Sequence, residues 1–514
     1  MPPPTLDQLL FPSQSGPDLA SNKLSHLLGD IRRSDLSIPN RLRSVCEDAA
    51  FVADVAAALP DFPLVANERC GSWYVDPATK KASAYFKSTD GHTGQWKFSL
   101  RRLNLHLLGL IGEYGGCIIV DSTRRGKRMP DALSKTIPIW CAVLNHILFP
   151  SITQELPGST HILHTPPDTV SASEAAQITA LLPGFVTSFF SLRADLQRAA
   201  GGPDKPLPAK PLRPVWITQD DRDHLGAWAQ GLQDLRKEWS VVVCCTSSRR
   251  AGQDEYARDG YSYVQGAGDD TENWALGLTP GIFWRCKSEL MDAAAAGEGV
   301  VESLIRGLVE KERSLARGEV DDDTEGGDEV WEKVREAVPG RGIYVGDLSA
   351  FRNPVAWEKE GVCVVVIRDK VTPPEEWVKG KRRLEVGLGR SKAASRALRD
   401  ALPTVCEFLL RYIREAQQRQ EEEAVDSESP SGRKPGVIIL CESGKDLSIG
   451  VALAVYCWCF NDAGKVRREE DGEALFNKTS IRVRLGHIVT ALPDVNPNRA
   501  TLQSVNSFLM DWRR

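Results

Sequence analysis

The chain has 514 residues, which is too long for one ordinary hydrophobic core, so two or three domains are expected. It carries 64 Lys and Arg against 69 Asp and Glu, and this formal charge of -5 excludes a uniformly basic nucleic-acid-binding protein. We expect no secretory signal, because the first residues have neither a basic region nor a long apolar core, and no apolar run approaches the roughly 20 residues of a membrane helix. We therefore expect a cytoplasmic protein with reduced thiols and no membrane partner.

Short β-branched apolar runs alternate with longer amphipathic stretches along the whole chain. The predicted buried strands are residues 117–122, 240–247, 361–369 and 436–443. The predicted helices are residues 131–148 and 390–414. A strand, a short loop and a helix, repeated in this way, predict an α/β fold with mostly parallel sheets.

An acidic stretch of low hydrophobicity supplies the main predicted domain boundary. It divides the chain into a large N-terminal α/β domain at residues 1–315, a linker at 316–340 and a C-terminal α/β domain at 341–514. A second linker-like segment, Gly/Pro-rich, lies inside the first domain at residues 199–214.

The first stretch suited to chemistry is residues 85–104, YFKSTDGHTGQWKFSLRRLN. Six of its residues supply a cation, two hydroxyls, a carboxylate, a flexible backbone and an imidazole: Lys87, Ser88, Thr89, Asp90, Gly91 and His92. Either Asp90 or His92 is suited to accept a proton. A polar hairpin loop has a similar composition, so the residues alone leave both interpretations open.

The second half of this stretch combines aromatic and basic side chains. Trp96 and Phe98 alternate as in a strand, and Arg101 and Arg102 follow them. Aromatic rings interleaved with cations suit stacking on bases and pairing with phosphates. The same pattern is typical of an ordinary half-buried strand.

A strongly basic loop, SerThrArgArgGlyLysArg, follows the predicted strand at 117–122. Because ligands of α/β proteins bind at the carboxyl ends of buried strands, its cations are candidates for phosphate binding. They are Arg124, Arg125, Lys127 and Arg128. A solvated charge run is the alternative.

Two further clusters are weaker. Asp269 and Asp270 stand among glycines and suit either Mg²⁺ coordination or a tight turn. A basic stripe in the C-terminal domain, suited to an RNA backbone, includes Lys381, Arg382, Arg383, Arg390 and Lys392.

The loop after the last predicted strand, CESGKDLS at 441–448, opens a helix and suits anion binding through its backbone N–H groups and Lys445. Its spacing resembles the phosphate loop of dual-specificity phosphatases, His-Cys-x-x-Gly-x-x-Arg-Ser. Cys441, Gly444 and Ser448 match, but Leu440 replaces the His and Leu447 replaces the Arg. Without these two residues Cys441 is a poor nucleophile, so we expect a binding loop or a tight turn without a ligand.

Together, five blocks spread along the chain resemble the initiator tRNA phosphoribosyltransferases of fungi and plants, and the resemblance extends over almost the whole chain apart from the linkers. The blocks are SNKLSHLLGDIRRSDLSIPNRLRSV, YFKSTDGHTGQWKFSLRRLN, IIVDSTRRGKRMPDALSKTIPIWCAVLN, YVQGAGDDTENWALGLTP and CESGKDLSIGVALAV. The resemblance implies transfer of a 5-phosphoribosyl group from phosphoribosyl pyrophosphate (PRPP) to the 2′-hydroxyl of A64 in cytoplasmic initiator methionine tRNA. It also implies a C-terminal domain similar to dual-specificity phosphatases.

This reaction gives each candidate group an expected role. Lys87, Asp90 and His92 are expected to be catalytic, with Mg²⁺ accompanying PRPP and Asp269 or Asp270 as its ligands. The residues expected to bind PRPP phosphates are Ser88, Thr89, Arg124, Lys127, Ser443, Gly444, Lys445, Asp446 and Ser448. The residues expected to bind tRNA are Arg101, Arg102, Arg125, Arg128 and the basic stripe. No DNA partner is expected, and the oligomeric state is open.

Two other functions fit the same residues less well. One is a non-catalytic tRNA-binding protein with a degenerate phosphatase domain. The other is a phosphatase that works through Cys441, which the missing Arg and His oppose.

Overall fold

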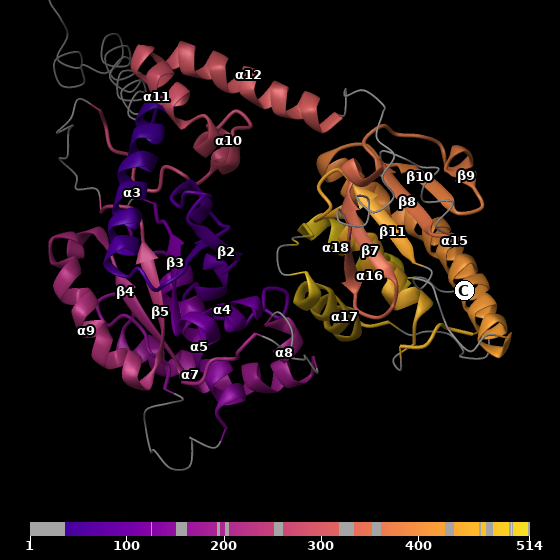
Figure 1. The fold of residues 1–514 in the computed structure, drawn as a ribbon, viewed down its shortest axis with the longest axis horizontal. Coiled ribbons are helices and arrows are strands. Elements are labelled where there is room, and N and C mark those ends of the chain that lie inside the picture. Colours follow the sequence, from indigo (N-terminus) through magenta and orange to yellow (C-terminus); the bar gives the residue numbers. More distant parts are fainter. Residues whose placement is uncertain are drawn as a thin grey trace, which may run out of the picture.

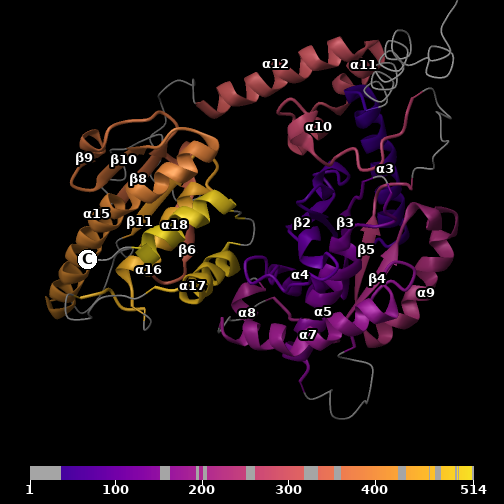
Figure 2. The ribbon, with the colours of Figure 1, turned by 180° about the vertical axis from the view of Figure 1, so that it is seen from behind.

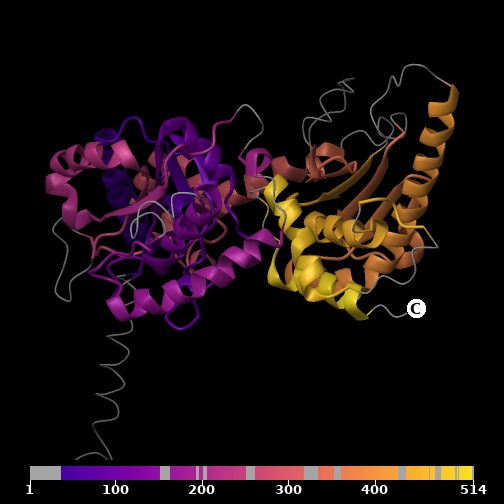
Figure 3. The ribbon, with the colours of Figure 1, turned by 90° about the horizontal axis from the view of Figure 1, so that it is seen from below.

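Two α/β domains lie side by side in the computed structural model, each built on one β-sheet (Figures 1 and 3). The structure describes residues 36–124, 126–150, 162–192, 196–200, 205–250, 261–317, 334–351, 361–426, 436–461, 464–468, 476–492, 495 and 497–511. No helix among these residues has the length and apolar character needed to cross a membrane.

The N-terminal sheet has five strands in the order β2-β1-β3-β5-β4, and every neighbouring pair is parallel. Its strands are β1 (Leu64–Asn67), β2 (Lys80–Ala84), β3 (Gly116–Asp121), β4 (Leu212–Ile217) and β5 (Ser240–Thr246). The longer helices of this domain are α3 (Ile38–Ala58), α4 (His106–Tyr114), α5 (Ile137–Leu148), α7 (Ala172–Phe190), α9 (Leu225–Glu238), α11 (Lys287–Ala296) and α12 (Glu298–Arg317). Two short ones are α8 (Leu196–Ala199) and α10 (Pro280–Arg285).

Helices cover both faces of this sheet because successive side chains of a strand point to opposite sides. Ile118 and Val120 join the core beneath α3 and α9, whereas Cys117 and Ile119 join the core beneath α4 and α5. All four side chains are fully buried. This two-sided burial explains why β3 is a continuous apolar run in the sequence.

The C-terminal sheet has six strands in the order β6-β7-β11-β8-β10-β9, parallel in its centre and antiparallel at both edges. Its strands are β6 (Val334–Val338), β7 (Ile343–Asp347), β8 (Cys363–Arg368), β9 (Val378–Gly380), β10 (Arg383–Gly387) and β11 (Val437–Cys441). Its helices are α15 (Ser391–Asp426), α16 (Leu447–Cys459), α17 (Lys478–Ala491) and α18 (Arg499–Asp511). Figure 2 shows α15, α16 and α18 grouped against this sheet.

The predicted α/β class is confirmed, and the differences lie at the ends of elements. Strand β6 pairs with β7, so the second sheet begins before the expected boundary at residue 341. The predicted strand around Trp96 and Phe98 is wrong: Lys97 N bonds back to Asp90 O at 2.8 Å, and Trp96 donates to Glu174 Oε1 at 3.1 Å.

The predicted helix at 131–148 begins with a π-helical turn, Ala132–Thr136, before α5. Pro138 stands in the first turn of α5 and has no N–H, so the regular bond to the carbonyl four residues earlier cannot form. The turn widens the backbone at the place where Lys135 enters the protein interior with only 5% of its surface exposed.

The two domains touch through α17. Val483 packs against the N-terminal core, and His487 Nε2 lies 3.1 Å from the carbonyl oxygen of Leu192. Burial lowers the pKa of His487, so its neutral form donates this bond. Arg101 and Arg102 add two further bonds across the same boundary.

Gly71 allows the close approach of the β1 loop to β3. A Cβ at this position would lie 2.2 Å from the carbonyl oxygen of Val120. We expect Gly71→Ala to destabilise the N-terminal domain by about 1–3 kcal/mol, measured by urea unfolding. The matched control is Gly231→Ala in α9, where nothing lies within 4 Å; it should stabilise by about 0.5–1 kcal/mol. Equal effects of the two changes would contradict the close packing.

Candidate active site

The strand order reverses between β1 and β3, because the chain leaves β1 toward β2 on one side and leaves β3 toward β4 and β5 on the other. In open parallel sheets, ligands bind outside the carboxyl ends of the strands at such a point. A cavity of about 230 Å³ lies there. It is lined by Arg69, Ser88, His92, Thr123, Arg124, Lys127, Pro130, Asp131, Asp269 and Asp270.

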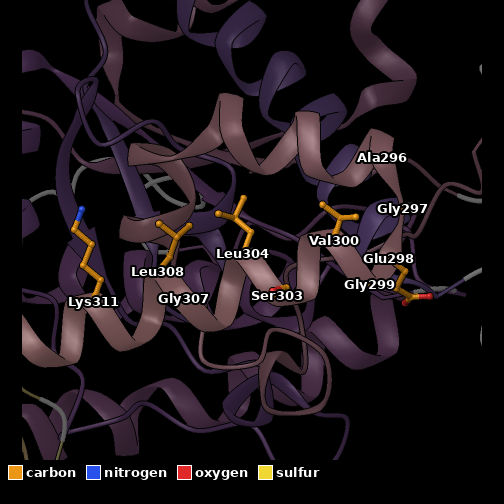
Figure 4. A pocket seen from close by; sticks show the side chains of 10 residues that line it. All are labelled: Ala296, Gly297, Glu298, Gly299, Val300, Ser303, Leu304, Gly307, Leu308 and Lys311. Atoms are coloured by element: carbon orange, nitrogen blue, oxygen red, sulfur yellow. The ribbon is translucent and has the colours of Figure 1, made fainter.

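A larger hollow, about 860 Å³, lies on α12 and is different in character (Figure 4). Its lining is mainly apolar or small, with Val300, Leu304 and Leu308 along one side of the helix and only Glu298 and Lys311 charged. It offers few groups for acid–base chemistry or phosphate binding. The smaller polar cavity is therefore the candidate active site.

Arg69 lies in the wall of this cavity and bonds to several of its neighbours. Its guanidinium binds both oxygens of Asp121, with Nε to Oδ2 at 3.1 Å and Nη2 to Oδ1 at 3.0 Å, and Nη1 donates to Asp269 Oδ1 at 3.0 Å. It also donates to the carbonyl oxygen of Ser122. Burial alone lowers the pKa of Arg69, but the neighbouring carboxylates outweigh this and raise it above its ordinary value. A cation is therefore held permanently at the cavity wall, with 24% of its side chain exposed.

Asp121 has no exposed surface and is saturated with donors. Besides Arg69, it accepts from Asn67 Nδ2 at 2.8 Å, from the Cys70 thiol at 2.9 Å and from its neighbour's amide, Ser122 N, at 2.8 Å. Burial raises the pKa of Cys70, so the thiol stays protonated and donates. Asp121 is thus a positioning group for Arg69, since no lone pair remains for a ligand.

The loop after β3 forms the opposite wall and carries two of the predicted phosphate ligands. Its backbone is fixed by Thr123, whose N–H donates to Ser248 Oγ at 3.0 Å, and by Gln265, which donates to Lys127 O at 2.8 Å. The Arg124 side chain is exposed, and Lys127 Nζ lies 2.8 Å from Asp131 Oδ2. The loop precedes the π-turn and α5.

His92 reaches the same cavity from the stretch after β2. Its Nε2 lies 3.6 Å from Asp131 Oδ2, and 46% of its side chain is exposed. Asp131 is held in turn by Lys135, whose Nζ lies 3.3 Å from Asp131 Oδ1 and 2.9 Å from Glu174 Oε1. The buried Lys135 therefore fixes the carboxylate beside the imidazole.

Asp90 faces a second, much smaller cavity and does not line the first. Lys87, Lys97 and Arg102 share that second cavity with aromatic residues such as Tyr85. Burial raises the pKa of Asp90, although the nearby cations oppose this. The structure therefore separates the two candidate bases, which the sequence placed two residues apart.

The remaining predicted residues of this stretch divide in the same way. Ser88 lines the main cavity, and its Oγ is buried without a hydrogen-bond partner among the described residues. Thr89 is exposed and does not line it. The short 3₁₀ helix Ser88–Gly91 thus presents one side to each cavity.

Several of the predicted RNA ligands already pair with acids. Arg128 lies 3.0 Å from Asp168, Arg383 pairs with Glu385, and Arg390 pairs with Asp369 at 2.5 Å. Lys381 is exposed and Arg382 is half-buried. Arg125 lies outside the described residues, and so does the side chain of Lys392.

The loop at Cys441 belongs to the C-terminal domain and is partly closed. Ser448 is fully buried with its Oγ 3.2 Å from the Cys441 thiol, and Asp446 accepts from Asn498 at 2.6 and 2.9 Å. Gly444 adopts a φ of +63° against β7, where a Cβ would lie 2.8 Å from the backbone. Of its five predicted ligands, Ser443 and Lys445 are the exposed ones.

The sequence missed Arg69, Asn67 and Asp121, the three residues that organise the cavity. Arg69 follows β1, a strand of only four residues, and its partner Asp121 is 52 residues away. A signal was present: Asp121 ends a strand whose other five residues are uncharged and buried, and a buried carboxylate requires a partner.

Sequence comparison relates both domains of the chain to known protein families. Residues 31–310 match the sequence description of the Rit1 N-terminal domain, and residues 382–509 match that of the Rit1 DUSP-like domain. The chain is 32% identical to the tRNA A64-2′-O-ribosylphosphate transferase of Saccharomyces cerevisiae, over 95% of each protein. The chain belongs to the Rit1 family. The family resemblance predicted from the five sequence blocks is confirmed.

Other relatives cover part of the chain. An uncharacterized Schizosaccharomyces pombe protein is 47% identical over 247 residues, which is 48% of this chain and 51% of that protein. Human DUSP28 has 14% identity and a TM-score of 0.21, covering 34% of this chain and 93% of its own. The Yvh1 phosphatase domain of Chaetomium thermophilum has 13% identity and a TM-score of 0.23, covering 34% and 94%.

The anion site can be tested with inorganic pyrophosphate as the probe. We expect Arg69→Lys to weaken pyrophosphate binding at least tenfold in calorimetry, because lysine cannot keep the forked contact with Asp121 and charge-assisted bonds contribute about 1.5–3 kcal/mol. Arg222→Lys is the control, since Arg222 pairs with Asp54 at the surface. If the two variants bind pyrophosphate with equal affinity, the anion site lies elsewhere in the protein.

Proposed function

We propose that this protein transfers a 5-phosphoribosyl group from PRPP to the 2′-hydroxyl of A64 in initiator methionine tRNA and releases pyrophosphate. The observation that carries the proposal is the fixed guanidinium of Arg69 in a polar cavity together with Arg124 and Lys127. The full-length likeness to the yeast transferase supports it. We also propose that the reaction takes place in the cytoplasm, where the expected initiator tRNA substrate acts.

The reaction breaks the bond between ribose C1 and pyrophosphate and forms a bond from C1 to the 2′-oxygen. Pyrophosphate leaves with the electron pair, and the hydroxyl proton passes to a base. Charge develops on the leaving group, so preorganised cations give the largest stabilisation. We assign Arg69, Arg124 and Lys127 to the pyrophosphate, and Ser88 Oγ to a hydroxyl or phosphate oxygen of PRPP.

The geometry favours His92 over Asp90 as the base. His92 lines the same cavity as the cations, and Asp131 stands beside its ring. Asp90 lines the other cavity and does not line this one. In this proposal Asp131 and Lys135 position the imidazole, while Asp90 and Lys87 act on the side of the acceptor RNA.

A Mg²⁺ ion that accompanies PRPP fits this cavity. No group of three or more potential ligands for a metal occurs among the described residues, but Mg²⁺ takes one or two carboxylates and completes its shell with phosphates and water. Asp269 is engaged by Arg69, whereas Asp270 lines the cavity and is exposed. Asp270 is therefore the proposed protein ligand, and the ion would supply neutralisation of pyrophosphate charge.

A phosphatase activity through Cys441 is less well supported. Only 2% of Cys441 is exposed, and its thiol bonds to Ser448. Lys445 is exposed and remains our proposed contact of this loop to a substrate phosphate.

The choice between the two bases gives a direct prediction. We expect His92→Gln to lower kcat for transfer of labelled ribosyl phosphate by 10²- to 10⁴-fold, the usual contribution of a positioned acid or base, with little change in the KM for PRPP. Asp90→Asn should instead act mainly through the KM for tRNA. A large loss of kcat in Asp90→Asn, with His92→Gln acting mainly through the KM for tRNA, would make Asp90 the base.

The C-terminal loop gives a second prediction for the same assay. Cys441→Ser should leave the transfer rate within about threefold of the unmodified protein, under 1 kcal/mol in the barrier. Lys445→Ala should raise the KM for a substrate if the loop holds a phosphate, and an unchanged KM would remove the loop from the site. Loss of transfer in Cys441→Ser would revive the phosphatase-type mechanism.

A further inference from the structure

Five basic side chains gather at the boundary between the domains. Lys87, Lys97, Arg101 and Arg102 belong to the stretch after β2, and Arg482 belongs to α17 of the other domain. Lys87, Lys97 and Arg102 line one small cavity. Arg482 lies close enough to Arg101 to contribute, after burial, to the lowered pKa of Arg101. We call these five residues the seam cluster.

The two arginines at the base of the cluster are held in place by neutral groups. Arg102 stacks over the ring of Tyr85, with its carbon Cζ 4.2 Å from the ring centre, and donates to the carbonyl oxygen of Val495 at 3.3 Å. Arg101 donates to the carbonyl oxygen of Pro497 at 3.3 Å. Burial lowers the pKa of Arg102 to about 10, so its charge is kept at a cost.

The positive charge of the cluster is only partly balanced, by one acid in its midst. Within the described part of the chain, none of the five residues forms an ion pair within 4.0 Å, and Asp90 acts at longer range on four of them, Lys87, Lys97, Arg101 and Arg102. Three of the other predicted RNA ligands differ, because Arg128, Arg383 and Arg390 pair with acids. Like charges that lie close together repel one another, and a bound polyanion would offset that repulsion.

The cluster also stands in the right place for an acceptor. The 3₁₀ helix Ser88–Gly91 separates it from the main cavity, with Ser88 and His92 on one side and Lys87 and Asp90 on the other. Lys87, Lys97 and Arg482 are exposed and so can reach a ligand at the surface. A strand bound at the cluster would pass beside His92.

We propose that the seam cluster binds the phosphodiester backbone of the acceptor RNA, so that the RNA lies across both domains and enters the main cavity from this side. This inference rests on the proposed function, and it shifts the principal RNA contact from the basic stripe at residues 381–392 to the domain boundary. A phosphate between Arg101 and Arg482 would separate two like charges and join the domains.

The test is binding of initiator tRNA at several salt concentrations, without PRPP, to the triple variant Lys87→Ala, Lys97→Ala and Arg482→Ala. We expect at least tenfold weaker binding at 0.1 M salt and a slope of log K against log salt that is smaller by about 2–3, since each phosphate contact contributes about 0.7–0.9. The three side chains are exposed, and an unchanged thermal melt checks the fold.

A matched control removes three other exposed cations, through Lys237→Ala, Arg222→Ala and Arg306→Ala, from the outer surfaces of the N-terminal domain. Equal tRNA affinity of the triple variant and this control would overturn the seam assignment, even if transfer is intact. If the double variant Arg383→Ala and Arg390→Ala binds tRNA more weakly and the seam variant does not, the basic stripe at residues 381–392 is the principal RNA contact. Displacement of tRNA by polyglutamate at equal charge would instead indicate an acidic protein partner.

The kinetic readout separates this inference from the proposed function. The seam variant should raise the KM for tRNA at least tenfold and leave the KM for PRPP within about threefold. If the unmodified protein binds tRNA but transfers nothing from PRPP, and the seam variant binds tRNA weakly, the seam assignment is supported and the proposed reaction is wrong.

Discussion

The structure of the site depends on one buried ion pair, between Arg69 and Asp121. A carboxylate with no exposed surface is stable in its charged form only when every lone pair is engaged. Here the donors come from the end of β1, from the loop that follows it and from the start of the loop after β3. The pair therefore fixes two loops, and Asp269 brings in a third from 200 residues away.

The site also divides its side chains between two cavities of different chemical character. The main cavity combines cations with an imidazole beside a carboxylate, a suitable arrangement for a charged leaving group and a proton transfer. The smaller cavity, about 10 Å³ in volume, combines cations and a carboxylate with aromatic rings. One short 3₁₀ helix lies between them, so substrates on its two sides would meet across a single turn of chain.

Much of this was accessible from the sequence, and the rest was not for physical reasons. Long, β-branched strands such as β3, β5, β8 and β11 are recognisable because burial on both faces makes them continuously apolar. β1 has four residues and gives no such signal, so the position of Arg69 depended on a strand that periodicity cannot find. The sequence shows which residues are basic, but whether a basic side chain is available to a ligand depends on which acids lie near it in the fold. That is a property of tertiary structure, as the pairs of Arg383 and Arg390 show.

The contacts of Arg101 and Arg102 with Val495 and Pro497 have a consequence for how the two domains coexist. Asn498, next in the chain, holds Asp446 in the loop at Cys441. In phosphatases the corresponding loop surrounds the substrate. Here the loop instead holds Asn498, next to the two carbonyl groups that accept hydrogen bonds from Arg101 and Arg102 of the other domain. The C-terminal domain is then a structural half of one enzyme and not an appended module. Its departure would leave the arginines beside Asp90 without their acceptors.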